Sequence, residues 1–335
     1  MEFDFFIGID VSKSELDFAV QQGNSFLFHK EIANESAAIN NFIKELCKLP
    51  GFKLSRALFC MEHTGIYNNH LLSCLHKKGA QLCLEAASQI RNSLGNIRGK
   101  NDKIDAMRIA GYAYDKQHKL RLWQPKRDIV QQLAHLSATR LRLITVKKQL
   151  QVPLQEHAAF STRKTGRQNL QICSHSLKAI DRDIARADKA IEQLIADDQE
   201  LTRIFKLTTS VSGIGKVTAV QLIVTTNEFK DIDNPKKFAC YSGIAPFTDD
   251  SGKVVKKARV SHMANKKVKT LLHLAAIVAI QYNQDLKLFY ERKVLQEKKN
   301  KMSVINAVRN KLILRIFACV NQNRPYEKNY QRTLV

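Results

Sequence analysis

The stretch Phe3-Asp-Phe-Phe-Ile-Gly-Ile-Asp10 decides the fold of the first part of the chain. Its odd-numbered residues are large and apolar, and this two-residue period predicts a β-strand that ends at Asp10. Two more strands are expected at 16–21 and 25–32, with a hairpin turn between them. Helix and strand signals then alternate, which predicts an α/β domain with a mixed sheet over residues 1–125.

The later elements of this domain follow from apolar spacing and from helix-capping signals. Asn34 is expected to cap the first helix of the domain. The remaining elements are expected as the helices 35–48, 67–78 and 102–117 and the strands 56–61 and 81–85.

The middle of the chain, residues 126–201, has leucine and isoleucine at helical spacing with polar residues between them. This pattern predicts two long helices, the first broken near Pro153 and the second beginning near Leu170. An antiparallel helical hairpin or coiled coil fits best, and arms of this kind commonly dimerise. The last part, residues 202–335, is predicted to be a mostly helical domain.

Charge narrows the class of partner. The 335 residues include 54 lysines and arginines and 31 aspartates and glutamates, which gives a net charge of +23. Residues 201–335 alone carry 25 basic and 9 acidic residues, a net charge of +16. A basic excess of this size is typical of proteins that bind the phosphate backbone of nucleic acids.

Membrane and disulfide classes are excluded by other features of the sequence. The longest apolar run, 271–280, is far shorter than the ~18–20 residues that a bilayer requires. The seven cysteines are scattered and never form a C-x-x-C pair, as expected for reduced thiols of a cytoplasmic protein.

Four acidic residues stand at positions suited to divalent-metal chemistry. Asp10 and Glu62 end apolar strands, and Asp102 and Asp105 share one face at the start of a helix. Carboxylates gathered in this way can bind Mg²⁺, with Mn²⁺ as an alternative, and support phosphoryl transfer. Each residue also has a structural interpretation of its own, such as a turn, an ion pair or a helix cap. Four carboxylates together at strand ends, however, are costly without a counter-ion.

Two features lie in the C-terminal part. The turn Gly213-Ile-Gly215-Lys216 between two expected helices resembles a helix-hairpin-helix element, whose backbone N–H groups bind phosphate. A plain glycine-containing connection between packed helices is the alternative interpretation. Ser251 lies in a polar turn flanked by cations, and residue types alone favour a structural role for it. A base or a metal would be needed to make its hydroxyl a nucleophile.

Together these motifs resemble the DEDD transposases, insertion-sequence recombinases related to the Piv/MooV DNA invertases. The resemblance covers about residues 5–290. The segments that carry it are Gly8-Ile-Asp10-Val-Ser-Lys13, Met61-Glu62-His-Thr-Gly65, Lys100-Asn-Asp102-Lys103-Ile-Asp105-Ala106, the glycine turn at 213–216, Phe238-Ala-Cys-Tyr-Ser-Gly-Ile-Ala-Pro246 and Asp250-Ser251-Gly252.

The resemblance implies a RuvC-like catalytic domain of the RNase H fold at 1–125, a coiled-coil arm at 126–201 and a second transposase domain at 202–335. It implies that the four carboxylates bind the metal and that Ser251 attacks DNA to form a phosphoseryl link. It further implies donor and target DNA bridged by a structured guide RNA. A homo-oligomer, dimer or tetramer, is expected because the serine and the carboxylates lie on separate domains. The residues expected to contact nucleic acid are Lys13, Lys100, Lys103, Gly213, Gly215, Lys216, Lys253, Lys256, Lys257 and Arg259.

The function expected is therefore DNA strand cleavage and exchange in transposition. Three alternatives remain open at this point. One is a RuvC-type junction endonuclease that uses water and forms no covalent intermediate. The others are a non-catalytic basic nucleic-acid-binding protein and a sugar-kinase-like phosphotransferase, although the later phosphate-binding glycine motifs of such kinases are missing.

Overall fold

The chain forms two compact units, residues 1–125 and 126–335, and each is described by itself. The computed structural model describes residues 2–94, 99, 101–248 and 258–328. Across these residues, no helix has both the length and the apolar character needed to cross a bilayer.

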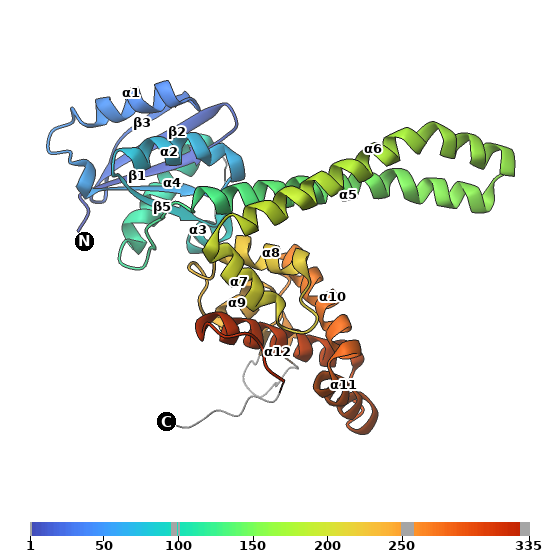
Figure 1. Cartoon of the computed structure of the whole chain (residues 1–335). Helices are drawn as coiled ribbons and strands as arrows, with labels where there is room; N and C mark the ends of the chain where they lie inside the picture. The colour runs from blue at the N-terminus through green and yellow to red at the C-terminus, as the bar shows by residue number, and fades with distance from the viewer. Residues whose placement is uncertain (1, 95–98, 100, 249–257, 329–335) are drawn as a thin grey trace. The chain divides into compact units, whose positions relative to one another are not determined.

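The first unit is built on a five-stranded mixed sheet, as predicted (Figure 1). Its strand order is β3-β2-β1-β4-β5, with β1 antiparallel to β2 and parallel to β4. This arrangement is compatible with an RNase H-like fold. The strands are β1 (Phe5–Val11), β2 (Glu15–Gln22), β3 (Ser25–Ala33), β4 (Ala57–Glu62) and β5 (Gln81–Glu85).

Helices cover both faces of this sheet because the strands are apolar on both sides. On β1, Phe5, Ile7 and Ile9 pack in a core with α1 (Ser36–Leu46) and α2 (Asn69–Lys77). The alternate residue Phe6 packs on the other side, in a core that includes residues of α3 (Ala87–Ser93) and α4 (Asp102–Lys116).

Gly8 lets α4 lie directly on β1. A Cβ at this position would stand 2.1 Å from the carbonyl oxygen of Ala106 and 2.2 Å from the amide nitrogen of Ala110. Those are backbone atoms and cannot turn aside, so any side chain at Gly8 would push the helix off the sheet. The glycine in the first motif therefore sets the distance between α4 and the strand that ends in Asp10.

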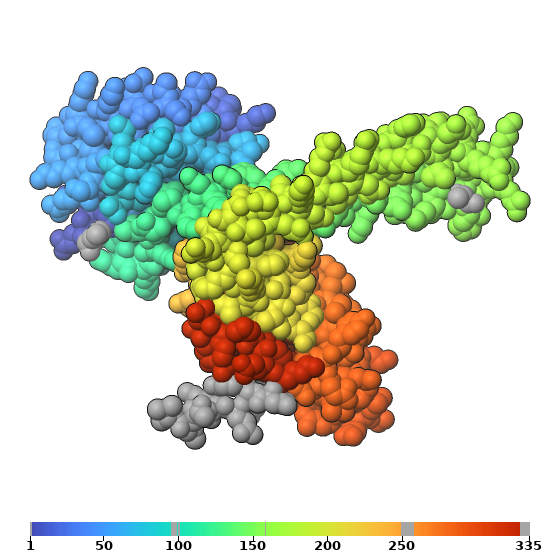
Figure 2. All heavy atoms as spheres, viewed as in Figure 1, coloured from blue at the N-terminus to red at the C-terminus, as the bar shows by residue number. Residues whose placement is uncertain are grey.

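The second unit combines a long helical pair with a helical core. The helices α5 (Asp128–Phe160) and α6 (Arg163–Ala196) lie side by side (Figures 1 and 2). Their basal residues, among them Val130 and Ile191, belong to the same hydrophobic core as the later helices. Those elements are α7 (Gln199–Thr209), α8 (Lys216–Thr226), α9 (Pro235–Tyr241), β6 (Pro246–Phe247), β7 (Arg259–Val260), α10 (Lys266–Tyr282), α11 (Gln284–Glu291) with a following π-helical turn (Arg292–Gln296), and α12 (Lys301–Asn321).

Three local predictions were wrong. The first long helix is not broken at Pro153, because proline removes only one backbone donor and the exposed helix continues beside α6. The second begins at Arg163, capped by Thr162, rather than near Leu170. Asn34 does not cap α1: the N-cap position is Glu35, and the Asn34 side-chain amide donates to the carbonyls of Ser12 and Tyr67 at 2.9 and 3.0 Å.

Candidate active site

Acidic side chains follow one another across four strands of the sheet. Glu62 is paired with Glu85 in the parallel register of β4 and β5, and Asp10 is paired with Asp17 in the antiparallel register of β1 and β2. Ile9 is paired with Met61, so Asp10 and Glu62 are the next residues at the carboxyl ends of neighbouring parallel strands. Adjacent strands lie about 4.8 Å apart, so these carboxylates are close neighbours along the sheet.

All four of these side chains belong to the face that α4 covers. Successive strand residues point to opposite faces, and Cys60 and Cys83 pack in the core that includes α4 residues. Glu62 and Glu85, each two residues further on, therefore share that face, as Asp10 does with Gly8. We call Asp17, Asp10, Glu62 and Glu85 the carboxylate row.

The start of α4 brings Asp102 and Asp105 to the same end of the sheet. Asn101 caps the helix by accepting a hydrogen bond from the Lys103 amide at 2.9 Å. Burial raises the pKa of Asp10, and the charges of Asp102 and Asp105 raise it further. The carbonyl of Ala106, the residue after Asp105, lies directly against Gly8, so the start of α4 lies beside the end of β1 that carries Asp10.

These residues fit a hard divalent cation in kind. Carboxylate oxygens are the ligands that Mg²⁺ prefers, and carboxylates that repel one another favour a cation between them. Within the described residues, however, no three potential ligands form a ready-made metal centre. Asp105 is instead bound to Arg108 at 2.8 Å, so its carboxylate would have to leave that partner to join a metal.

Two members of the carboxylate row, Asp17 and Glu85, were not among the site residues predicted from the sequence. Asp17 is buried and contacts the His29 ring nitrogen Nε2 at 2.7 Å. Glu85 accepts a hydrogen bond from the Cys83 thiol at 3.5 Å. The alternation along each strand would have assigned their face, but only the register between strands places them beside Asp10 and Glu62.

A two-stranded ribbon, β6 and β7, frames the segment that carries Ser251. Pro246 is paired with Val260 and Phe247 with Arg259, an exposed residue expected to contact nucleic acid. Ser251, Lys253, Lys256 and Lys257 lie outside the described residues, as does Lys100 in the first unit.

The turn that leads into this ribbon is hydrogen-bonded to α12 and to the N-cap residue of α10. The side chain of Asn306 on α12 donates to the carbonyl of Ile244 at 2.8 Å, and that of Asn265 donates to the Tyr241 hydroxyl at 2.8 Å. Gly243 has φ +63° and lies so close to Ala264 that a Cβ would meet its side chain at 2.4 Å. The Tyr-Ser-Gly-Ile-Ala-Pro motif therefore fixes the base of the ribbon.

The glycine turn at 213–216 connects α7 and α8. Gly213 has φ +91°, and a Cβ there would stand 2.4 Å from the carbonyl oxygen of Ala275 on α10. Close packing against α10 thus accounts for Gly213, whereas Gly215 is the exposed N-cap of α8 with open space around it. Lys216 is ion-paired with Glu192 at 2.5 Å.

The two described lysines of the first unit that were expected to contact nucleic acid are both exposed. Lys13 follows β1 by two residues, and Lys103 lies in the first turn of α4. Each therefore stands within a few residues of Asp10 or Asp102 along the chain.

Comparison with known proteins identifies the class. A family model described as "Transposase", of the DEDD type, matches residues 7–158, which include β1, β4 and α4. A second model, "Transposase IS116/IS110/IS902 family", matches residues 206–291, which include the ribbon and its supporting helix α10. The chain is therefore a transposase, an enzyme of DNA recombination.

The chain belongs to the IS110 family of transposases. It is similar to the pilin gene-inverting proteins of Moraxella lacunata and Moraxella bovis, with 28% and 27% identity over 96% of this chain and 98% of each relative. An uncharacterised 43.6 kDa protein of insertion element IS110 from Streptomyces coelicolor is 24% identical over 42% of this chain and 34% of that protein.

Proposed function

We propose that this transposase cleaves and exchanges DNA strands with a carboxylate site in its first unit and a serine nucleophile in its second. The observation that carries the proposal is the shared face of Asp10 and Glu62 at neighbouring strand ends, with Asp102 and Asp105 nearby. In this proposal residues 1–125 form the metal-binding domain, residues 126–201 form the arm, and residues 202–335 form the domain that carries the serine.

The four carboxylates Asp10, Glu62, Asp102 and Asp105 would hold Mg²⁺ or Mn²⁺. When bound, such a cation stabilises negative charge on a transferring phosphoryl group and activates the attacking oxygen. The protein itself contributes by holding these carboxylates in place. Gly8 keeps α4 against β1, so the helix carboxylates stay near the strand carboxylates.

Ser251 is the proposed nucleophile, because it lies in the family motif after the Tyr-Ser-Gly-Ile-Ala-Pro segment. Its oxygen would form a bond to the DNA phosphorus while the 3′ or 5′ oxygen of the broken strand leaves. The hydrogen bonds from Asn306 and Asn265 fix the turn that precedes β6, which supports this role because the alignment of a nucleophile with the phosphorus depends on a fixed chain nearby. Lysines 253, 256 and 257 would neutralise the charge of the transition state.

DNA, both donor and target, is the proposed substrate, and a structured RNA is the proposed guide. The net charge of +16 over residues 201–335 supports contacts to phosphate backbones. The Moraxella relatives, which match over nearly their whole length, are named for inverting a gene, and DNA inversion likewise cuts and rejoins strands. A homo-oligomer would bring the serine of one subunit to the carboxylates of another, and the long arm formed by α5 and α6 is its proposed interface.

Replacing single carboxylates tests the proposed metal site. Asp10→Asn keeps the shape of the side chain but removes its charge, so DNA cleavage and Mn²⁺ binding should each fall by about a hundredfold or more. Asp115→Asn, which alters an exposed carboxylate further along α4, is the matched control and should leave both unchanged. Equal losses in the two variants, or full cleavage by Asp10→Asn, would rule out the metal site.

The carboxylate arrangement alone would also suit a RuvC-type junction endonuclease that uses water. The two mechanisms differ in one product. Only the serine mechanism leaves protein covalently attached to a DNA end after denaturation.

A further inference from the structure

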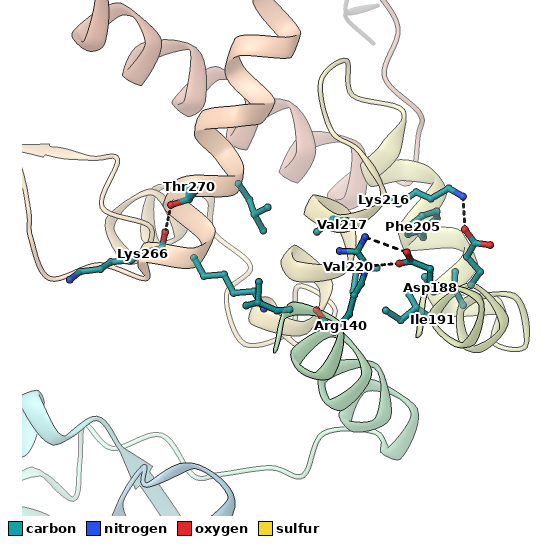
Figure 3. Close-up of a pocket in the computed structure, with 15 residues that line it drawn as sticks. Arg140, Asp188, Ile191, Phe205, Lys216, Val217, Val220, Lys266 and Thr270 are labelled. Carbon is teal, nitrogen blue, oxygen red and sulfur yellow. Dashed lines mark hydrogen bonds and ion pairs between the residues drawn. The ribbon is translucent and has the colours of Figure 1, made fainter. Parts of the chain in front are cut away.

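The second unit contains a cavity of about 370 Å³ between the base of the arm and the helices α7, α8 and α10 (Figure 3). Its walls are apolar, with Ile191 and Ile195 from α6, Val217 and Val220 from α8, and Leu271 from α10. The ring of Phe205 also lines it. Its volume lies near the lower end of the roughly 300–1,000 Å³ typical of small-ligand sites.

Four basic residues, Arg140, Lys216, Lys266 and Lys267, are among those that line this apolar space. Arg140 is paired with Asp188, and Lys216 with Glu192, as the dashed lines in Figure 3 show. Lys266 is exposed, and its ammonium group points away from the cavity in Figure 3. Lys267 is partly buried, and among the described residues no ion pair with a carboxylate offsets that burial.

The start of α10 makes the ammonium group of Lys267 more attractive to an anion. Lys267 lies in the first helical turn, which contains no acidic residue, so the partial positive charge of the helix end adds to its own. Burial lowers the pKa of Lys267, as expected for an ammonium that has lost water and gained no counter-ion.

We propose that this cavity binds one unpaired nucleotide, with the base between the apolar walls and its phosphate at Lys267. A nucleotide supplies what both parts of the site lack: a flat apolar ring for the walls and a negative charge for this lysine. Phe205 provides a ring against which a base can stack. The proposal rests on the nucleic-acid-binding function proposed above and adds a site that admits single-stranded RNA or DNA and excludes a paired base.

An apolar side chain of a partner protein would fit the walls less completely. It would bury the ammonium group of Lys267 further and bring it no counter-charge, which is costly. Charge therefore favours the nucleotide, and protein docking becomes an outcome of the test.

The decisive variant fills the cavity. Val217→Trp places a large ring at a wall residue that is 43% exposed, and Val278→Trp is its matched control. Val278 is 40% exposed on α10 and does not line the cavity. Binding of three fluorescein-labelled probes to the full-length protein is measured by anisotropy: a short oligouridine, an oligothymidine of equal length and a DNA duplex.

Val217→Trp should weaken binding of a single-stranded probe at least about tenfold, equivalent to about 1.4 kcal/mol. Val278→Trp should change it less than about twofold, and duplex binding should stay the same in both variants. Loss for oligouridine alone identifies RNA as the source of the nucleotide, and loss for oligothymidine alone identifies DNA. Equal single-strand binding by both variants would overturn the proposal.

A second measurement keeps the test valid if Val217→Trp unfolds, which thermal denaturation would reveal. Photo-cross-linking with 4-thiouridine and 4-thiothymidine probes should label peptides that contain Phe205 or Leu271 in the unaltered protein. Lys267→Met should reduce this labelling several-fold, whereas Lys287→Met, an exposed lysine on α11, should not. Labelling confined to other peptides would contradict the proposal.

These outcomes separate the cavity from the function on which it rests. If the unaltered protein bound none of the three probes, the proposed nucleic-acid binding itself would fail. If it bound them and Val217→Trp changed only the sedimentation of the protein, the cavity would be a protein-docking site instead.

Discussion

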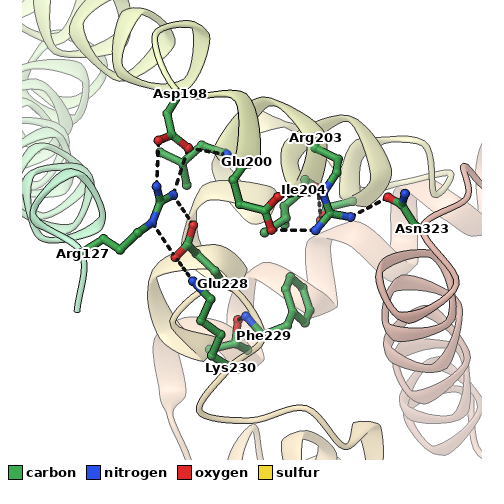
Figure 4. A network of polar contacts seen from close by, with 12 residues as sticks. Arg127, Asp198, Glu200, Arg203, Ile204, Glu228, Phe229, Lys230 and Asn323 are labelled. Carbon is green, nitrogen blue, oxygen red and sulfur yellow. Dashed lines mark hydrogen bonds and ion pairs between the residues drawn. The ribbon is translucent and has the colours of Figure 1, made fainter. Parts of the chain in front are cut away.

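An ion-paired cluster joins the start of α5 to the loop after α6 and to the end of α8 (Figure 4). Arg127 donates two hydrogen bonds to Asp198, at 2.8 and 2.9 Å, and two to Glu228, one of them at 3.0 Å. The Glu228 side chain is 0% exposed, and Lys230 also donates to it at 2.9 Å. We expect this cluster to stabilise the second unit.

Asp198→Asn isolates the contribution of the charge. Asp198 also accepts a hydrogen bond from the Leu201 amide at 2.8 Å as the N-cap of α7, and asparagine caps helices about as well. The side-chain hydrogen bonds from Arg127, followed by the backbone bond from Leu201, lower the pKa of Asp198 from 3.8 to about 2.

The pKa shift sets an upper limit on the loss of stability. Each pKa unit corresponds to about 1.4 kcal/mol, so the full shift would be worth about 2–3 kcal/mol. The Arg127 side chain is 38% exposed, however, and water screens the pair. We therefore expect Asp198→Asn to lower the free energy of unfolding of the second unit by about 1–1.5 kcal/mol at pH 7.

Two optical signals separate the units during urea denaturation. The single tryptophan, Trp123, lies in the first unit and packs against its core, so its fluorescence reports that unit. Circular dichroism at helical wavelengths reports chiefly the second unit, which contains the longest helices. Asp198→Asn should shift the dichroism transition and leave the tryptophan transition in place.

The direction of the pKa shift determines how the stability contribution of Asp198 changes with pH. Because folding depresses the pKa of Asp198, its contribution is fully present above about pH 4 and is lost as the pH falls towards 2. The gap between the unaltered protein and Asp198→Asn should therefore narrow from pH 4 downwards. A gap that stayed the same at pH 7 and pH 3, or a shift of both transitions together, would refute the reasoning.

Two further predictions concern the first unit and the nucleic-acid surface. Gly8→Ala should destabilise the first unit by about 1–3 kcal/mol in the tryptophan assay, because its Cβ overlaps the backbone of α4. Gly111→Ala, in open space on the same helix, should stabilise it slightly, and equal effects of the two substitutions would contradict the account. Affinity for duplex DNA should fall steeply with salt, with a logarithmic slope of about −4 or steeper if five or more phosphates are contacted. A flat response would exclude a basic surface that follows the phosphate backbone.

Local periodicity in the sequence predicted most of the first unit. The strand ending in Asp10, its hairpin partners and the helix that begins at Asp102 all appear within one or two residues of their expected bounds. These elements were predictable because period-two and helical apolar patterns follow directly from which face is buried.

Long-range geometry could not be predicted in the same way. Asp17 and Glu85 join the carboxylate row only through strand register, which no single segment encodes. The ion pair between Asp105 and Arg108 and the ribbon of β6 and β7 likewise depend on packing. At Pro153 a strong local preference gave the wrong prediction. Proline predicts a helix break there, but α5 continues through this residue beside α6.

The proposed function depends most on a serine that attacks DNA in concert with carboxylates of the first unit. The direct measurement is to incubate the protein with its DNA and Mg²⁺, denature it and search for peptide–nucleotide adducts by mass spectrometry. We predict an adduct at Ser251 that is absent from both Ser251→Ala and Asp10→Asn, while both variants still bind DNA. Cleaved DNA without any adduct, or an adduct at another residue such as Ser242 or Ser261, would contradict the account.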